Sequence, residues 1–133
     1  MNTTGTTQTL YERIGGADAV EAAVRLMYDK ILADPMLAPF FARFTHSRMS
    51  HLIRMQCDFI GSAIGGPETY EGMDMKSVHR DRGITTLHFM RVAEHLSAAL
   101  GELGVGANDA ADLLAIVATL HDDVVTVPEA AAS

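Results

Sequence analysis

Tryptophan is absent from this chain of 133 residues, and cysteine occurs once, at Cys57. A single cysteine excludes an intramolecular disulfide, so the fold cannot depend on a disulfide framework. No apolar run is long enough to cross a lipid bilayer, and the opening segment MNTTGTTQT lacks the basic and apolar regions of an export signal. These absences predict a protein of the cytoplasm with no membrane partner.

Positive charge is also scarce: 10 Lys and Arg residues stand against 17 Asp and Glu, a net charge of -7. A chain with that charge and no Lys/Arg-rich face repels phosphate, so we do not expect it to bind nucleic acid. Its length suits one domain, which can bury roughly two thirds of the surface exposed by the unfolded chain. We expect that domain to span residues 9–125, with flexible segments at 1–8 and 126–133.

Apolar residues recur at helical spacing through most of the chain, and no stretch alternates convincingly as a β-strand does. We therefore predict an all-α fold. Gly15-Gly16 and Gly65-Gly66 mark helix ends, and Asp34-Pro35 ends another. The expected helices span residues 9–14, about 18–33, about 47–64, 85 to near 104, and 108 onward, with a further short helix opening at Pro35.

The stretch MKSVHRDRGITTLHF, residues 75–89, places a histidine between two predicted helix ends. Asp74 can cap a short helix, Gly83 can end it in the left-handed conformation, and Thr85 can cap the next helix. His79 therefore falls in the last turn of a helix of one or two turns, where the backbone fixes its direction. A histidine so placed is either a satisfied core or surface residue or a metal ligand.

Two polar side chains interrupt apolar helix faces. Gln56 stands in the stripe of the helix at 47–64, where its amide needs a backbone partner, a polar partner across the core, or a ligand. Tyr28 lies beside the stripe of the helix at 18–33 and either fills the core or points a donor into a pocket. With His79 and the pair Phe40-Phe41, these residues would suit an iron porphyrin, which needs an imidazole, aromatic walls and hydrogen-bond donors.

The sequence resembles the group I truncated haemoglobins from Leu10 to about Val125. The resemblance rests on several motifs in order, and their spacing together is specific. It implies a shortened globin fold in which two antiparallel helix pairs sandwich haem b, an iron protoporphyrin. The motifs are LYERIGG at 10–16, YDKILADPMLAPFF at 28–41, Gln56 followed by Gly65-Gly66, and VHRDRGIT at 78–85 followed by His88-Phe89.

The same resemblance implies roles for individual residues. His79 would be the proximal iron ligand, and Tyr28 and Gln56 would form the distal pair that donates hydrogen bonds to the gas on the iron. The propionates need cations, for which the candidates are Arg48, Arg54, Lys76, Arg80 and Arg82. The residues expected to contact the haem are Phe41, Leu52, Met55, Phe59, Arg80, Ile84, Phe89 and Val117.

The chain departs from the family pattern between Phe41 and Gln56, where it has about three more residues than expected. We expect a longer loop at residues 44–47 that reshapes the distal entrance. Met55 stands where some relatives place a histidine that binds iron. Either Met55, His51 or His46 fills the sixth iron position, or these residues are bystanders and the position is open to gases.

Three functions follow from these residues. The first is a haem protein that binds dioxygen, nitric oxide and carbon monoxide reversibly, with oxidation of nitric oxide to nitrate as its enzymatic use. That oxidation needs an external reductase, because nothing in this chain binds a flavin or nicotinamide. The second is a six-coordinate haem protein for electron transfer or for redox or gas sensing, and the third is a helical interaction module without a cofactor. We expect a monomer or weak dimer.

Overall fold

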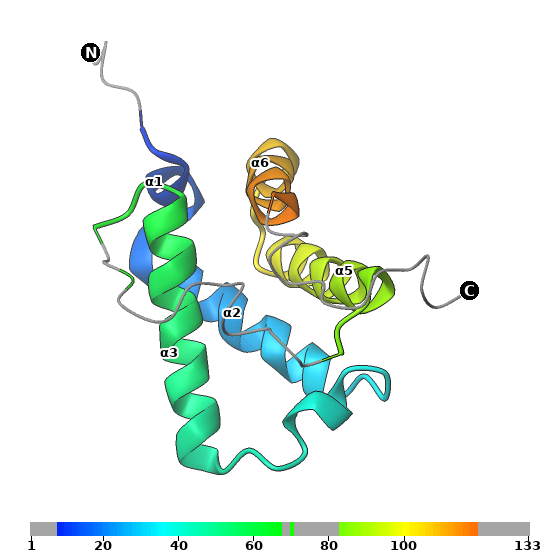
Figure 1. The fold of residues 1–133 in the computed structure, drawn as a ribbon. Helices are drawn as coiled ribbons and strands as arrows, with labels where there is room; N and C mark the ends of the chain where they lie inside the picture. Colours follow the sequence, from blue (N-terminus) through cyan, green and yellow to red (C-terminus); the bar gives the residue numbers. More distant parts are fainter. Residues whose placement is uncertain (1–7, 68–69, 71–82, 120–133) are drawn as a thin grey trace, which may run out of the picture.

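The computed structural model describes residues 8–67, Tyr70 and 83–119. Within these residues the chain forms five α-helices and one short 3₁₀ helix, and no strand (Figure 1). The predicted all-α class is confirmed. No helix in the described part of the chain combines the length and apolar character needed to cross a membrane. The elements are α1 (Leu10–Ile14), α2 (Gly16–Leu32), η1 (Ala38–Phe41), α3 (His46–Ala63), α5 (Thr86–Glu102) and α6 (Ala107–Ala118).

The junction between α1 and α2 follows from a capping box and two glycines. The Thr9 hydroxyl accepts a hydrogen bond from the Glu12 amide at 3.1 Å, and the Glu12 carboxylate accepts one from the Thr9 amide at 3.0 Å. Gly15 and Gly16 then adopt φ angles of 121° and 77°. Since side-chain-bearing residues rarely adopt positive φ, the glycine pair permits the chain to turn directly into α2. The predicted end of the first helix is confirmed.

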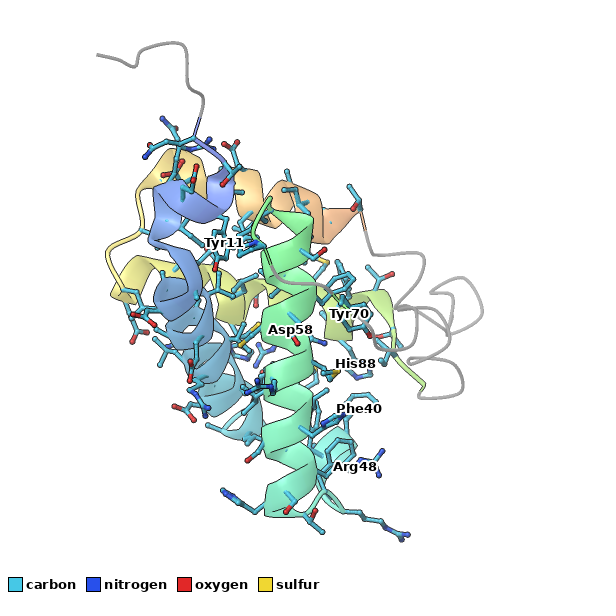
Figure 2. The ribbon with its side chains drawn as sticks, turned by 90° about the vertical axis from the view of Figure 1, so that its left-hand side faces the viewer. Tyr11, Phe40, Arg48, Asp58, Tyr70 and His88 are labelled. Atoms are coloured by element: carbon cyan, nitrogen blue, oxygen red, sulfur yellow. The ribbon has the colours of Figure 1, made fainter. Side chains whose placement is uncertain are left out.

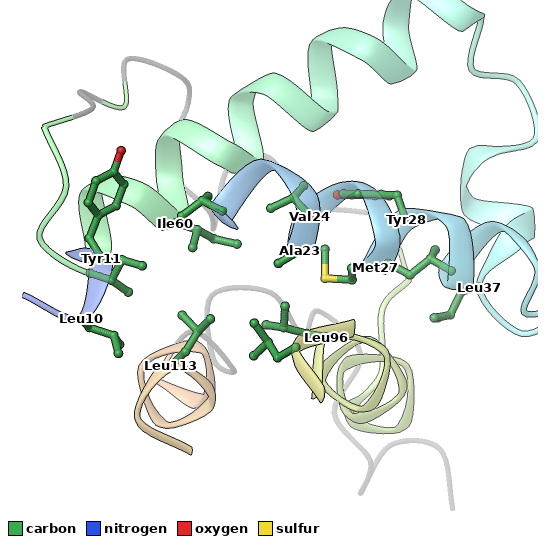
Figure 3. Close-up of a cluster of buried hydrophobic side chains, with 14 residues drawn as sticks. Leu10, Tyr11, Ala23, Val24, Met27, Tyr28, Leu37, Ile60, Leu96 and Leu113 are labelled. Carbon is green, nitrogen blue, oxygen red and sulfur yellow. The ribbon is translucent and has the colours of Figure 1, made fainter. Parts of the chain in front are cut away.

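Helix α2 is the centre of the fold, because it packs against α1, α3, α5 and η1. In Figure 3 its buried face, which includes Val24 and Met27, meets Ile60 of α3, Leu96 of α5 and Leu113 of α6. Burial of such side chains is the main stabilising contribution, at about 25 cal/mol per Å² of apolar surface.

Leu32, the last residue of α2, does not belong to the buried face of that helix. Its side chain is 44% exposed. The apolar stripe ends at the buried Ile31, and the next residue projects roughly 100° further round the helix, toward solvent.

The turn after α2 differs from the short helix that we predicted at Pro35. A side-chain oxygen of Asp34 accepts a hydrogen bond from the Met36 amide at 2.9 Å, and its carbonyl accepts one from Leu37 at 3.0 Å. These bonds favour a turn rather than a helix at that point. The helical segment comes three residues later as η1, with Pro39 in its first turn, and it delivers Phe40 and Phe41 to the interior.

The expected long loop at residues 44–47 is also wrong. Thr45 caps α3, since its hydroxyl accepts a hydrogen bond from the Arg48 amide at 3.1 Å. Only residues 42–45 therefore join η1 to α3. Residues 46 and 47 belong to α3 rather than to a loop.

The two C-terminal helices begin at different kinds of cap. Thr85 caps α5 as predicted, whereas α6 begins after Gly106 rather than after Asn108. Gly106 has an extended backbone, φ −60° and ψ 149°, so Asn108 falls inside the first turn of α6. The short helix predicted to carry His79 lies outside the described residues.

Candidate functional site

An apolar cavity lies between α2, α3, α5 and α6, with η1 closing one end. Its volume is about 210 Å³, whereas one water needs roughly 10–15 Å³. Its volume therefore suits a large ligand. Among the described residues that line it, only Tyr28, Gln56 and His88 carry polar side-chain groups.

Tyr28 places a hydroxyl in this apolar surrounding. Its side chain is 6% exposed, and burial raises the pKa of the phenol well above its usual value of about 10, with a smaller contribution from the nearby Cys57 thiol. The hydroxyl therefore stays protonated and can donate. None of the hydrogen bonds among the described residues involves it. A buried polar group without a partner costs about 1–3 kcal/mol, so this donor suits a bound ligand.

Gln56 of α3 supplies a second polar group to the cavity lining. It lies halfway along α3, half-buried among cavity residues, and its amide likewise has no hydrogen-bond partner among the described residues. No hydrogen bond joins it to Tyr28 within that part of the chain. The two side chains therefore face one cavity as separate donors.

Aromatic rings form the wall of the cavity beside Tyr28. Phe41 meets Tyr28 edge to face, with ring centroids 5.9 Å apart and planes at 88°. Phe44 packs on Phe41 in the same way at 5.4 Å, and the guanidinium carbon of Arg48 lies 4.2 Å from the Phe44 centroid. Such edge-to-face contacts fix ring positions, so the wall is a preformed surface for a large apolar molecule.

The structure brings most of the predicted site residues to this cavity. Their roles toward haem stay predictions. The predicted residues that line the cavity are Tyr28, Phe41, Leu52, Gln56, Phe59, Ile84, Phe89 and Val117.

Met55 differs from its neighbours Leu52 and Gln56. It is half-buried on the flank of α3 and is not among the described residues that line the cavity. His46 and His51 are exposed on the same helix. The predicted iron ligand His79 and the predicted haem contact Arg80 lie outside the described residues, as do Lys76 and Arg82.

His88 is a cavity residue that the sequence analysis did not single out. Its Nδ1 accepts a hydrogen bond from the Thr85 amide at 3.0 Å, while the Thr85 hydroxyl accepts one from the His88 amide at 3.2 Å. Its ring packs edge to face on Phe40 with centroids 5.0 Å apart, and Figure 2 shows the two side by side. The sequence could have indicated its place, because it stands three residues after the predicted cap Thr85, where the partner residue of a capping box lies.

A buried carboxylate next to the cavity was also missed. Asp34, 4% exposed at the end of α2, accepts hydrogen bonds from Arg91 Nη2 at 2.8 Å and lies 2.7 Å from His95 Nε2. The His95 contact, the Met36 amide and Arg91 together lower the pKa of this carboxyl to about 2. The cluster ties the end of α2 to α5, which lines the opposite side of the cavity.

Comparison with known proteins identifies the family to which this arrangement belongs. The family model described as "Bacterial-like globin" matches residues 9–126. A group 1 truncated hemoglobin of Mycolicibacterium paratuberculosis is 41% identical over 117 residues, which cover 88% of this chain and 84% of that protein. The chain belongs to the truncated haemoglobin family.

Solved structures of truncated haemoglobins have the same fold as this chain. The truncated hemoglobin from Tetrahymena pyriformis in its Fe(III) form superposes with a TM-score of 0.84 at 35% identity, covering 90% of this chain and all of that one. The 2/2 hemoglobin from Synechococcus sp. PCC 7002, in the cyanomet state with covalently attached heme, has a TM-score of 0.81 at 34% identity and covers 88% and 98% of the two chains. The predicted shortened globin fold is confirmed.

The cavity of this truncated haemoglobin suits haem, the cofactor of its family. Haem is a broad apolar disc, and the rings of Phe41, Phe44 and Phe59 offer it aromatic contacts. The Tyr28 hydroxyl and the Gln56 amide, which have no hydrogen-bond partner among the described residues, add two polar groups to this apolar surface. Haem-based gas binding is therefore the general function of the chain.

Proposed function

We propose that this truncated haemoglobin binds dioxygen, nitric oxide and carbon monoxide reversibly at a haem held by His79, with Tyr28 and Gln56 as the distal donors. The observation that carries the proposal is the Tyr28 hydroxyl, which is buried, kept protonated and without a hydrogen-bond partner among the described residues. Without a bound ligand, burial of this donor would lower the stability of the fold.

Haem, when bound, would supply an iron that binds a diatomic gas. The remaining contributions come from the chain. Tyr28 donates a hydrogen bond to the gas, Gln56 donates a second, and Phe41 fixes the ring of Tyr28. A hydrogen bond to a charged acceptor contributes about 1.5–3 kcal/mol, so one donor slows release of a polarised ligand by roughly 10- to 100-fold.

The same donors suit two physiological uses, which are oxygen binding and oxidation of nitric oxide. In the second use one nitric oxide and one dioxygen become nitrate, and the iron gives up one electron. An external reductase must return that electron before the next cycle. Rapid consumption of nitric oxide by the oxygenated protein supports the enzymatic use, whereas slow consumption together with high oxygen affinity leaves oxygen binding alone.

An open sixth position is part of this proposal, and the position of Met55 supports it. Met55 is not among the described cavity residues, and His46 and His51 are exposed. The six-coordinate alternative requires one of these side chains to reach the iron.

Absorption spectra of the haem-loaded protein distinguish the open sixth position from the six-coordinate alternative. A five-coordinate ferrous spectrum that converts fully with carbon monoxide supports the open site. A low-spin six-coordinate ferrous spectrum that changes on Met55→Leu overturns it and favours electron transfer or sensing.

A further inference from the structure

Three arginines, one in the loop before α3 and two in its first half, differ from the other described cations. Arg43, Arg48 and Arg54 are exposed, and none of them forms an ion pair within the described residues. Every other Lys or Arg of the described chain pairs with an Asp or Glu. Those paired cations are Arg13, Arg25, Lys30 and Arg91.

The sequence near Arg43 and Arg48 contains no compensating charge, whereas Asp58 lies one helical turn after Arg54. No Asp or Glu occurs between Asp34 and Asp58, although the whole chain has a net charge of -7. Arg48, His51 and Arg54 are spaced three residues apart, so they follow one another along the surface of α3. We call Arg43, Arg48, His51 and Arg54 the basic strip. The positive end of the α3 dipole lies at the same end and adds to its field.

The basic strip adjoins the wall of the cavity. Arg48 lies over the ring of Phe44, with 4.2 Å between its guanidinium carbon and the ring centroid, and Phe44 lines the cavity beside Phe41. Figure 2 shows α3 at the front of the molecule with Arg48 at its N-terminal end. The ring of Phe44 therefore lies between a group bound in the cavity and the exposed positive charge of Arg48.

We propose that the basic strip is the docking surface for an acidic electron-transfer protein that reduces the haem. This inference rests on the proposed function, since a haem protein whose iron becomes ferric needs an electron donor. The net negative charge of the chain repels an acidic donor at most approaches, whereas the strip attracts it. Attraction at the basic strip orients the donor beside the cavity. Such a contact is small and sensitive to salt, as redox encounters usually are.

The length of the basic strip favours a protein partner over the propionates of the haem itself. Propionates need one or two cations at the rim of the cavity. The strip extends beyond that rim, from the loop before α3 to Arg54, more than two turns into the helix. A surface of that length fits a protein partner. If the arginines served only the propionates, their loss would speed release of haem without changing its reduction.

The test compares two haem-loaded variants of equal net charge. One is Arg43→Gln/Arg48→Gln/Arg54→Gln, and the other is Ser97→Asp/Asn108→Asp/Ala111→Glu, which adds the same negative charge on exposed positions of α5 and α6. The probe is reduced flavodoxin, an acidic one-electron donor, mixed with the ferric protein in a stopped-flow instrument. We expect the arginine variant to be reduced at least about tenfold more slowly than the parent at low salt. The control variant should change far less, and the difference should vanish near 1 M salt, where screening is nearly complete.

Further measurements separate the outcomes. Reduced methyl viologen, a small cation, should reduce the arginine variant as fast as the control variant. If the triple variant fails to fold, the single variant Arg43→Glu, in the loop ahead of α3, takes its place. Flavodoxin should also reduce this variant more slowly than the parent. Amide shifts of flavodoxin titrated with the carbon monoxide form of the parent report docking without any electron transfer, and they should weaken for the arginine variant.

Two results would overturn the inference. Equal slowing in the arginine and control variants would mean that net charge alone matters. Unchanged reduction with faster transfer of haem to apomyoglobin would assign the arginines to the propionates. Carbon monoxide binding is measured first, because a parent that fails to bind it overturns the proposed function, whereas normal binding with equal reduction rates overturns this inference alone.

Discussion

Arg91 on α5 binds the buried carboxylate of Asp34 at the end of α2 through two of its nitrogens, Nε at 3.0 Å and Nη2 at 2.8 Å. The two residues are 57 positions apart in the sequence. The carboxylate also holds the turn that leads into η1 through the Met36 amide. One side chain thus connects helix packing with the placement of the aromatic wall.

Replacing Asp34 with Asn should lower the melting temperature and reduce its dependence on acid pH. The carboxyl has a pKa of about 2 in the folded protein and an ordinary value of 3.8. A lowered pKa stabilises the fold above the ordinary value, and that stability is lost as the pH falls from about 4 toward 2. Thermal unfolding measured from pH 6 to pH 2 checks this. The exposed Asp29→Asn on the same helix is the control, and an equally steep acid loss in both variants would refute the assignment.

Tyr28→Phe should speed dissociation of dioxygen by about 10- to 100-fold, because the ligand loses a charge-assisted hydrogen bond. The haem-free protein should be no less stable than the parent, since the substitution removes a buried hydroxyl that has no partner among the described residues. Stopped-flow displacement of dioxygen by carbon monoxide and thermal unfolding measure the two effects. Tyr11→Phe, on α1 and away from the cavity lining (Figure 2), should leave the dissociation rate unchanged.

Gln56→Leu should also speed dissociation of dioxygen, and its effect should add to that of Tyr28→Phe. Additivity follows because no hydrogen bond joins the two side chains within the described residues. Independent sites add within about 0.3–0.5 kcal/mol. A double-mutant cycle on the dissociation rate measures the coupling. A much larger coupling energy would mean that Gln56 acts by holding the tyrosine rather than by donating to the gas.

His79→Gly should abolish stable five-coordinate haem binding, since we predict this histidine as the proximal ligand. Added imidazole should restore the ferrous spectrum in part by taking the vacated position. The controls are His51→Ala and Met55→Leu, which should leave the spectrum of the parent. Retention of the parent spectrum in His79→Gly would reject the assignment.

Gly15→Ala should destabilise the protein by about 1 kcal/mol or more. Gly15 has φ 121°, and a Cβ there would stand 3.0 Å from Cβ of Ala19. Gly101→Ala is the matched comparison, because a Cβ at that helical position would meet nothing within 4 Å. It should stabilise the protein by roughly 0.5–1 kcal/mol through the higher helix propensity of alanine. Chemical denaturation measures both free energies of unfolding.

The sequence predicted those features that depend on local chemistry. The side chains of Thr9, Glu12 and Thr85 accept hydrogen bonds from nearby backbone amides. The helix starts at Thr9 and Thr85 could therefore be predicted from the spacing of these residues. The stripe containing Leu52, Gln56 and Phe59 follows from helical period alone, and all three line the cavity.

Other features depend on contacts between residues far apart in sequence. The pairing of Asp34 with Arg91 and His95 requires α2 and α5 to be packed first, so the helical periodicity of the sequence does not predict it. The loop predicted at residues 44–47 was wrong for a local reason. The Thr45 hydroxyl caps α3, so the helix begins at residue 46. Leu32 shows that an apolar residue at a helix end need not belong to the core.

The central position of α2 constrains how gas affinity can change. Tyr28 lies on the helix that contacts nearly every other element, so its neighbours are fixed by the requirements of folding. Helix α3 packs against α2 and presents Leu52 and Gln56 to the cavity from its own side. Leu52 and Gln56 are only half-buried, so sequence variation at these two positions should disturb the core less than variation at Tyr28. Relatives with different affinities should differ there first.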